Sequence, residues 1–155
     1  MGLDMYLYQR KNKGTYNKLT GIIKYEGDEE IGYWRKFNAL HALILDLTDS
    51  NRDINCEEIN LSTDVLAQIL DTLKQVNDLI SPYVDNKRTE NYKLDLPEEV
   101  FDQVMELLPP QPGFFWGPTI IDAWYADDVV HSIVIFERAL KLSNEGEQIF
   151  YYGWW

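Results

Sequence analysis

The spacing of apolar residues changes along the chain, and this change limits the folds it can adopt. Near the N-terminus, Leu3, Met5 and Leu7 alternate with Asp4 and Tyr6, which is the two-residue period of a strand with one buried face. In four later segments the apolar residues recur at three- and four-residue steps, which is the period of a helix. The aromatic C-terminal segment returns to residues that favour strands. The sequence therefore predicts strands at both ends and helices between them.

The helical segments and strands are assigned as follows. Helices are predicted over 33–47, 62–80, 96–108 and 122–142. Strands are predicted over 3–8, 21–25 and 148–155, with a loop at 10–18, a turn at 27–30 and a polar loop at 48–60. Regular alternation of strands and helices is absent, which argues against a parallel doubly wound sheet. We therefore expect one domain, 1–155, of α+β class. About four helices would pack on a small, mainly antiparallel sheet formed by the N-terminal strands and the C-terminal strand.

The charge and the cysteine content exclude several classes of function. The 26 acidic residues exceed the 14 basic ones, and the net charge of −12 opposes nonspecific binding to nucleic acid or anionic membrane. No apolar run is long enough to span a bilayer. The single cysteine, Cys56, forbids an internal disulfide, which suits a reducing compartment. We expect a cytoplasmic protein without direct nucleic-acid or membrane contact. A protein that imitates nucleic acid with carboxylates remains an alternative.

An aromatic and polar segment, 30–41, is the first candidate binding site. In the predicted helix, Arg35, Asn38 and His41 stand three residues apart and form a slanted polar stripe. Such a stripe could hold a phosphate and the polar edge of a base. Tyr33 and Trp34 would lie at the helix N-terminus, where free N–H groups favour anions. A core position for Trp34 is the structural alternative.

A second aromatic segment, 113–125, precedes the last predicted helix. Its glycines permit close backbone approach, and Phe115 or Trp116 could stack on a ring. Thr119, Asp122 and Tyr125 follow in the sequence; Asp122 could cap the helix or accept a hydrogen bond from a ribose hydroxyl. A buried aromatic strand is the competing interpretation. We expect the two segments to meet around one pocket.

Other chemistry has weaker support in the sequence. His131 follows Asp127 and Asp128 at helical spacing, but a solvated helix face explains these residues better than a metal site. No phosphate loop, dinucleotide fingerprint, nucleophile elbow or HExxH motif is present. The sequence predicts no metal, no cofactor and no catalytic residue. It favours a binding protein over an enzyme, with a weak hydrolase acting through His41 as a further alternative.

Three blocks of sequence together resemble one family. Residues 1–7 read MGLDMYL, residues 30–41 read EIGYWRKFNALH, and residues 113–125 read GFFWGPTIIDAWY. The set resembles a family of small, mostly uncharacterised phage and prophage proteins. The chain departs from the family pattern at Pro118, Ile120 and Ile121, where more polar residues are usual.

The resemblance implies a biological setting rather than a reaction. Small viral accessory proteins include some that sequester nucleotide immune signals, and by analogy we expect a phage-derived protein that binds a small anionic, ring-containing ligand. The alternative is an acidic inhibitor, or a DNA mimic, that acts on a host defence protein. The aromatic segment 150–155 indicates either a buried strand or a contact in a homo-oligomer.

Overall fold

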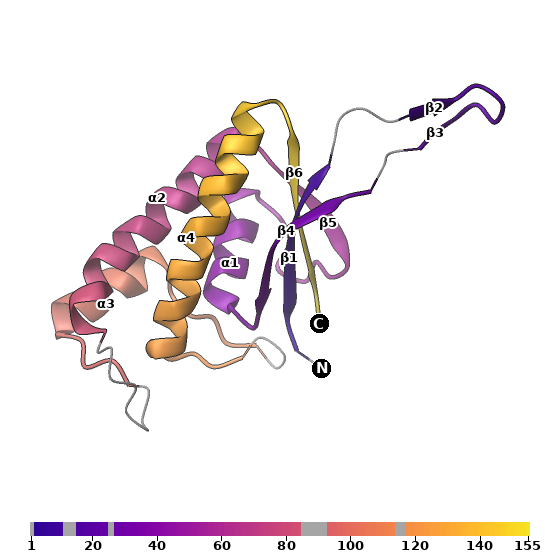
Figure 1. Ribbon diagram of the computed structural model, residues 1–155. Helices are drawn as coiled ribbons and strands as arrows, with labels where there is room; N and C mark the ends of the chain where they lie inside the picture. Colours follow the sequence, from indigo (N-terminus) through magenta and orange to yellow (C-terminus); the bar gives the residue numbers. More distant parts are fainter. Residues whose placement is uncertain (1, 11–14, 25–26, 85–92, 114–116) are drawn as a thin grey trace.

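The main sheet has four strands in the order β4-β1-β6-β5, and every neighbouring pair is antiparallel. The computed structural model describes residues 2–10, 15–24, 27–84, 93–113 and 117–155. The strands of the sheet are β1 (Asp4–Arg10), β4 (Glu29–Arg35), β5 (Glu57–Leu61) and β6 (Gln148–Trp154). A separate hairpin of β2 (Thr15–Asn17) and β3 (Ile22–Lys24) projects away from the body (Figure 1).

The helices lie together on one side of this sheet (Figure 1). They are α1 (Asn38–Leu47), α2 (Thr63–Ile80), α3 (Glu98–Leu107) and α4 (Ala123–Asn144), with a short 3-10 turn η1 (Ser81–Tyr83) after α2. Helices α2 and α4 pack along each other, and α4 also contacts β4 and β6. The arrangement confirms the predicted α+β class, with four helices on an antiparallel sheet. In the described residues, no helix has the length and apolar character needed to cross a membrane.

The core forms where the inner face of the sheet meets the helices. Leu3, Met5 and Leu7 are fully buried, and along β1 they alternate with partly exposed residues, as the sequence predicts. Leu40 of α1 and Phe136 of α4 are equally buried. Burial of each such side chain stabilises the fold by about 1.5–3 kcal/mol, so this layer fixes the position of the helices on the sheet.

Two strands of the main sheet were not predicted. β4 lies where the sequence predicted a turn and the start of a helix, because Glu29 and Glu30 and the glycine at 32 hide its alternation. β5 lies in the predicted polar loop; it is an edge strand in which only Ile59 and Leu61 are buried. The strand predicted at 21–25 corresponds to β3, which belongs to the hairpin rather than to the main sheet.

The first predicted helix begins five residues later than expected. Lys36 has a φ of 63°, far from the value of about −63° that a helix requires. The chain therefore ends β4 at Arg35 and starts α1 at Asn38. Tyr33 and Trp34 lie in a strand, so their predicted place at a helix N-terminus is wrong.

The other three helices confirm their predicted positions to within about two residues. The Ser62 side chain accepts a hydrogen bond from the Val65 N–H at the start of α2. The Asp122 carboxylate accepts one from the Tyr125 N–H, at 2.9 Å, at the start of α4. Side-chain oxygens satisfy a free N–H at both helix starts.

We predict that Gly32→Ala destabilises the fold. A Cβ at this position would lie 2.6 Å from Cγ2 of Ile135 and 3.0 Å from the Trp34 ring. Overpacking of this kind costs about 1–3 kcal/mol, and chemical denaturation would measure it. Val134→Ala is the matched control, because Val134 is the exposed neighbour of Ile135; a loss of stability as large in this control would contradict the packing argument.

Candidate functional site

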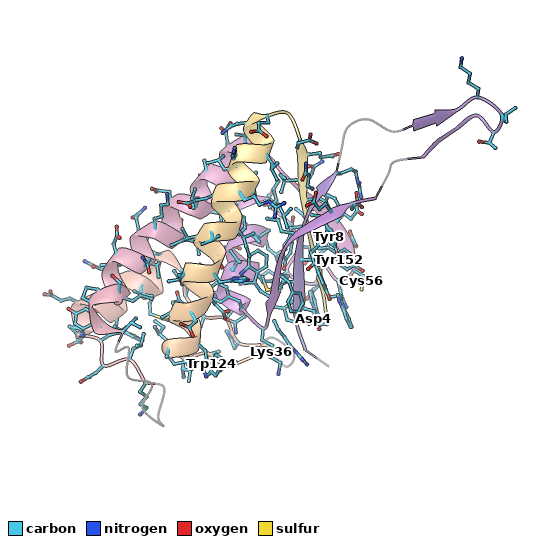
Figure 2. The ribbon with its side chains drawn as sticks, in the orientation of Figure 1. Asp4, Tyr8, Lys36, Cys56, Trp124 and Tyr152 are labelled. Atoms are coloured by element: carbon cyan, nitrogen blue, oxygen red, sulfur yellow. The ribbon has the colours of Figure 1, made fainter. Side chains whose placement is uncertain are left out.

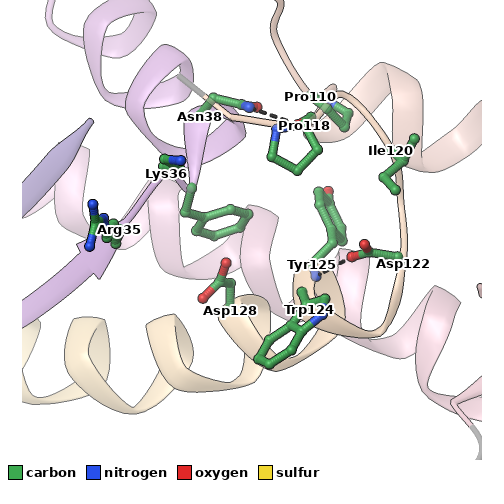
Figure 3. A pocket seen from close by; sticks show the side chains of 11 residues that line it. Arg35, Lys36, Asn38, Pro110, Pro118, Ile120, Asp122, Trp124, Tyr125 and Asp128 are labelled. Carbon is green, nitrogen blue, oxygen red and sulfur yellow. Dashed lines mark hydrogen bonds between the residues drawn. The ribbon is translucent and has the colours of Figure 1, made fainter. Parts of the chain in front are cut away.

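A pocket of about 270 Å³ lies where β4 ends, α1 begins and the chain approaches α4 (Figure 3). Residues from both aromatic segments line it, together with a proline that follows α3. The lining residues are Arg35, Lys36, Phe37, Asn38, Pro110, Pro118, Ile120, Asp122, Trp124, Tyr125 and Asp128. The two segments that the sequence singled out therefore do meet around one pocket.

The Asn38 side chain connects two segments of the chain that form the pocket wall. Its Nδ2 donates a hydrogen bond to the Pro118 carbonyl at 2.9 Å (Figure 3). Its Oδ1 accepts one from the Gln111 N–H at the same distance. The side chain is 3% exposed. Buried amide hydrogen bonds of this kind are costly to lose, so Asn38 holds the two loop segments of the pocket wall against α1 rather than presenting its amide to solvent.

The backbone turn at Lys36 forms the second connection. Its N–H donates to the Leu3 carbonyl at 2.7 Å, and its own carbonyl accepts from the Asn38 N–H at 2.9 Å. A Cβ at Gly2 or at Gly117 would approach the Lys36 side chain to 2.7 or 2.8 Å. Gly117 also has a φ of 99°, which disfavours other residues. All three sequence blocks thus meet at Lys36.

The floor of the pocket is aromatic and buried. The Phe37 and Tyr125 rings meet edge to face with centroids 5.6 Å apart. The Tyr125 hydroxyl donates to the Leu108 carbonyl at 2.7 Å, and burial raises the pKa of this tyrosine far above its usual value. Tyr125 therefore stays neutral and positions the wall, because its hydroxyl is already engaged.

The rim of the pocket combines cations, carboxylates and an exposed ring. Arg35 and Lys36 are exposed on one side, and the Trp124 indole is 55% exposed on another (Figure 3). Burial raises the pKa of Asp128 to about 7, with the nearby Asp127 and Asp122 carboxylates adding to the effect. Near neutral pH the Asp128 carboxyl can therefore accept or donate a hydrogen bond.

Several predicted site residues lie elsewhere. Trp34 is a core residue, 2% exposed, whose Nε1 donates to the Ser132 Oγ at 2.8 Å. Tyr33 lies on the sheet face that points away from the helices; its hydroxyl donates to Asp4 at 2.5 Å, which is the main reason that its pKa rises to about 12. Neither residue lines the pocket.

His41 is fully buried and does not line the pocket. Its Nδ1 lies 2.6 Å from the Tyr151 hydroxyl, with which it shares a hydrogen bond. Burial, followed by the charge of Arg52, lowers its pKa to about 4. The predicted stripe of Arg35, Asn38 and His41 is wrong, because Arg35 belongs to a strand and His41 points into the core.

The remaining predicted site residues do not all line the pocket. Asp122 and Tyr125 line the pocket, Thr119 is exposed and does not, and Phe115 and Trp116 lie outside the described residues. Sequence reasoning overlooked Lys36, Trp124 and Asp128 as site residues. Trp124 was visible as a large ring beside an N-cap, whereas Lys36 and Asp128 required the fold.

The described residues hold no cluster of three histidine, cysteine, aspartate or glutamate side chains that could bind a metal ion. His131, which the sequence places near Asp127 and Asp128, has its Nε2 3.2 Å from the Tyr33 carbonyl. This contact joins α4 to β4 and gives the imidazole a structural role in the helix–sheet interface.

Comparisons with known proteins give one distant similarity. No protein family matches the chain, and no solved structure matches it. The chain is similar to the chloroplastic/mitochondrial lysine–tRNA ligase of Arabidopsis thaliana, with 27% identity over 164 residues. The match covers 93% of this chain but only 27% of the ligase, so the chain spans about a quarter of that relative's length.

Asn38→Asp should open the wall of the pocket. The carboxylate keeps an acceptor for the Gln111 N–H but loses the donor to the Pro118 carbonyl, and two acceptors then face each other. We expect faster amide hydrogen exchange in 117–122 and a loss of about 1–3 kcal/mol of stability. Asn60→Asp on β5 is the control, and equal exchange rates in both variants would contradict the role of Asn38.

The raised pKa of Asp128 gives a pH-dependent prediction. Because the pKa of Asp128 is raised, the folded state binds the proton of this carboxyl more tightly than the unfolded state does. The stability that the bound proton contributes is present near pH 4 and is lost as the pH rises to about 7. Asp128→Asn should therefore match the wild type at pH 4 and exceed it at pH 8. After discounting for solvent screening, we expect a gain of roughly 1 kcal/mol, or about 2–4 °C in melting temperature. A difference independent of pH would contradict this.

Proposed function

We propose that the pocket binds a small anionic ligand that contains a flat ring, such as a nucleotide-like molecule. One observation carries the proposal. In the described part of the chain, Arg35 and Lys36 form no ion pair, although Arg10, Arg52, Lys74 and Arg138 each pair with a carboxylate. In a protein with 26 acidic residues, two neighbouring cations at the edge of a pocket favour an external anion as their partner.

Each part of the rim has a role in this proposal. The guanidinium of Arg35 would form paired hydrogen bonds to a phosphate or carboxylate, and Lys36 would add a point charge. Trp124 would stack on the ring of the ligand, a contact that contributes about 1–3 kcal/mol for a nucleic-acid base. Asp128 would contact a hydroxyl or an N–H group of the ligand.

The geometry favours binding over catalysis. Tyr125 and Asn38 have their polar atoms engaged within the protein, and His41 is buried with a lowered pKa. These groups hold the pocket in shape before a ligand arrives, which reduces the ordering cost of binding. A weak hydrolase acting through His41 receives no support from this arrangement.

The family resemblance suggests the setting for such binding. We infer a phage-derived accessory protein that acts in the cytoplasm of the host cell and sequesters a nucleotide-like immune signal. Sequestration requires only tight binding and an abundant protein, and the shaped pocket with its pair of cations would supply the binding. The small volume of the pocket, about 270 Å³, suits a single ring with its phosphate and leaves part of a larger ligand at the surface.

Isothermal titration calorimetry with cyclic nucleotides and ADP-ribose derivatives tests the proposal. We expect one of them to bind, and Arg35→Ala and Trp124→Ala each to weaken binding by about tenfold or more, as expected for the loss of roughly 1.4 kcal/mol. Lys74→Ala removes an equal charge from an exposed position on α2 that does not line the pocket and should leave affinity unchanged. The absence of heat with every compound, or an equal effect of Lys74→Ala, would refute the proposal.

A further inference from the structure

The sheet face that points away from the helices is an aromatic surface, which we call the open face. Tyr33, Tyr6 and Tyr152 form one row across β4, β1 and β6. Tyr8 and Phe150 are paired in the next row. Figure 2 shows Tyr8 and Tyr152 on the side of the sheet opposite the helices.

The rings of the open face contact one another and so form a continuous platform. The Tyr6 ring lies 5.1 Å from Tyr33 and 5.9 Å from Tyr8, and Tyr8 lies 5.3 Å from Phe150, measured between centroids. At the edge, Trp154 is 41% exposed. Tyr33 is 40% exposed, Tyr6, Tyr8 and Tyr152 are partly exposed, and Phe150 is buried beneath its neighbours. None of the described helices covers this aromatic surface, and apolar surface left uncovered in this way favours an interaction site.

Acidic side chains border the open face. Asp4 accepts the hydrogen bond from Tyr33, and Glu30 is paired with Tyr8 across the strands. Of the cations on this face, Arg10 is shared between Asp28 and Glu58 at 2.9 Å each, and Arg35 lies opposite Asp4 across the strands. A partner that brings cations and apolar groups therefore fits this surface best, since rings and carboxylates both attract cations.

The projecting hairpin of the same chain carries the cations and apolar side chains that such a partner needs. Between Arg10 and Glu26 the sequence contains no acidic residue and has lysines at 11, 13, 18 and 24. At its tip, Leu19 is 97% exposed, and β2 and β3 pair only with each other among the described strands. The hairpin leaves the body at the end of β1, next to the open face (Figure 1).

The dimensions of the hairpin and the face also match. The nine residue steps from Arg10 to Leu19 could span at most about 30 Å if fully extended, and the seven residues of β1 extend for about 23 Å. A hairpin from one molecule is therefore long enough to cross the open face of another. We propose that two copies of this chain pair through their open faces, with the hairpin of each copy lying across the aromatic platform of the other, in a twofold arrangement.

Pairing of two copies in this way does not depend on the proposed ligand. The protein should therefore be a dimer in solution. Light scattering coupled to size-exclusion chromatography should give twice the chain mass of 18.2 kDa. Lys18→Glu with Leu19→Asp at the exposed tip should raise the dissociation constant at least about tenfold. Tyr6→Ala, with its fold checked by circular dichroism, should do the same from the other side of the contact.

A control variant introduces the same change of charge as the tip variant, but on the helices. Lys74→Glu with Val134→Asp alters two exposed positions on α2 and α4 and should leave the dimer intact. If the wild type stays monomeric up to its solubility limit, a second copy of this chain is not the partner that binds the open face. A dimer that persists unchanged in the tip variant would overturn the role of the hairpin.

Discussion

The turn at Lys36 is the constraint on which the rest of the structure depends. Its left-handed backbone conformation ends β4 and redirects the chain into α1 two residues later. Such a conformation costs a non-glycine residue about 1–3 kcal/mol. The hydrogen bond to Leu3 and the close packing of Gly2 and Gly117 hold it in place. The same contacts bring the N-terminus, the end of β4 and the segment before α4 to one point, and the pocket lies there.

Strand alternation then separates two surfaces with different properties. Along β4, Trp34 points into the core and bonds to Ser132, whereas Tyr33 and Arg35 point outward. Because β1 and β6 keep the same register, Leu3, Met5 and Leu7 lie under the helices together with Tyr151, whereas Tyr6, Tyr8 and Tyr152 lie on the open face. A shift of one residue would exchange these sets, so the buried aliphatic face also fixes the position of the aromatic one.

The helices and the general location of the pocket could be predicted from the sequence, because caps and apolar periodicity are local signals. Ser62 and Asp122 cap the helices as expected. β4 and β5 could not be predicted, since their acidic and glycine residues depend on pairing with distant strands for their conformation. The same limit explains the site. Trp34 and His41 have the residue types of a binding site, yet only the turn at Lys36 decides that they point into the core.

The distribution of charge connects the two proposals. A molecule with a net charge of −12 repels anionic ligands and also a second copy of itself, so binding of either kind requires local positive charge. Arg35 and Lys36 supply it at the pocket, and the lysines between Arg10 and Glu26 supply it at the hairpin. Elsewhere Arg10, Arg52, Lys74 and Arg138 are neutralised by carboxylates. Under the two proposals, an anionic ligand would bind at the pocket and a second copy would bind through the hairpin, and the acidic surface would disfavour contact with the carboxylate-rich regions.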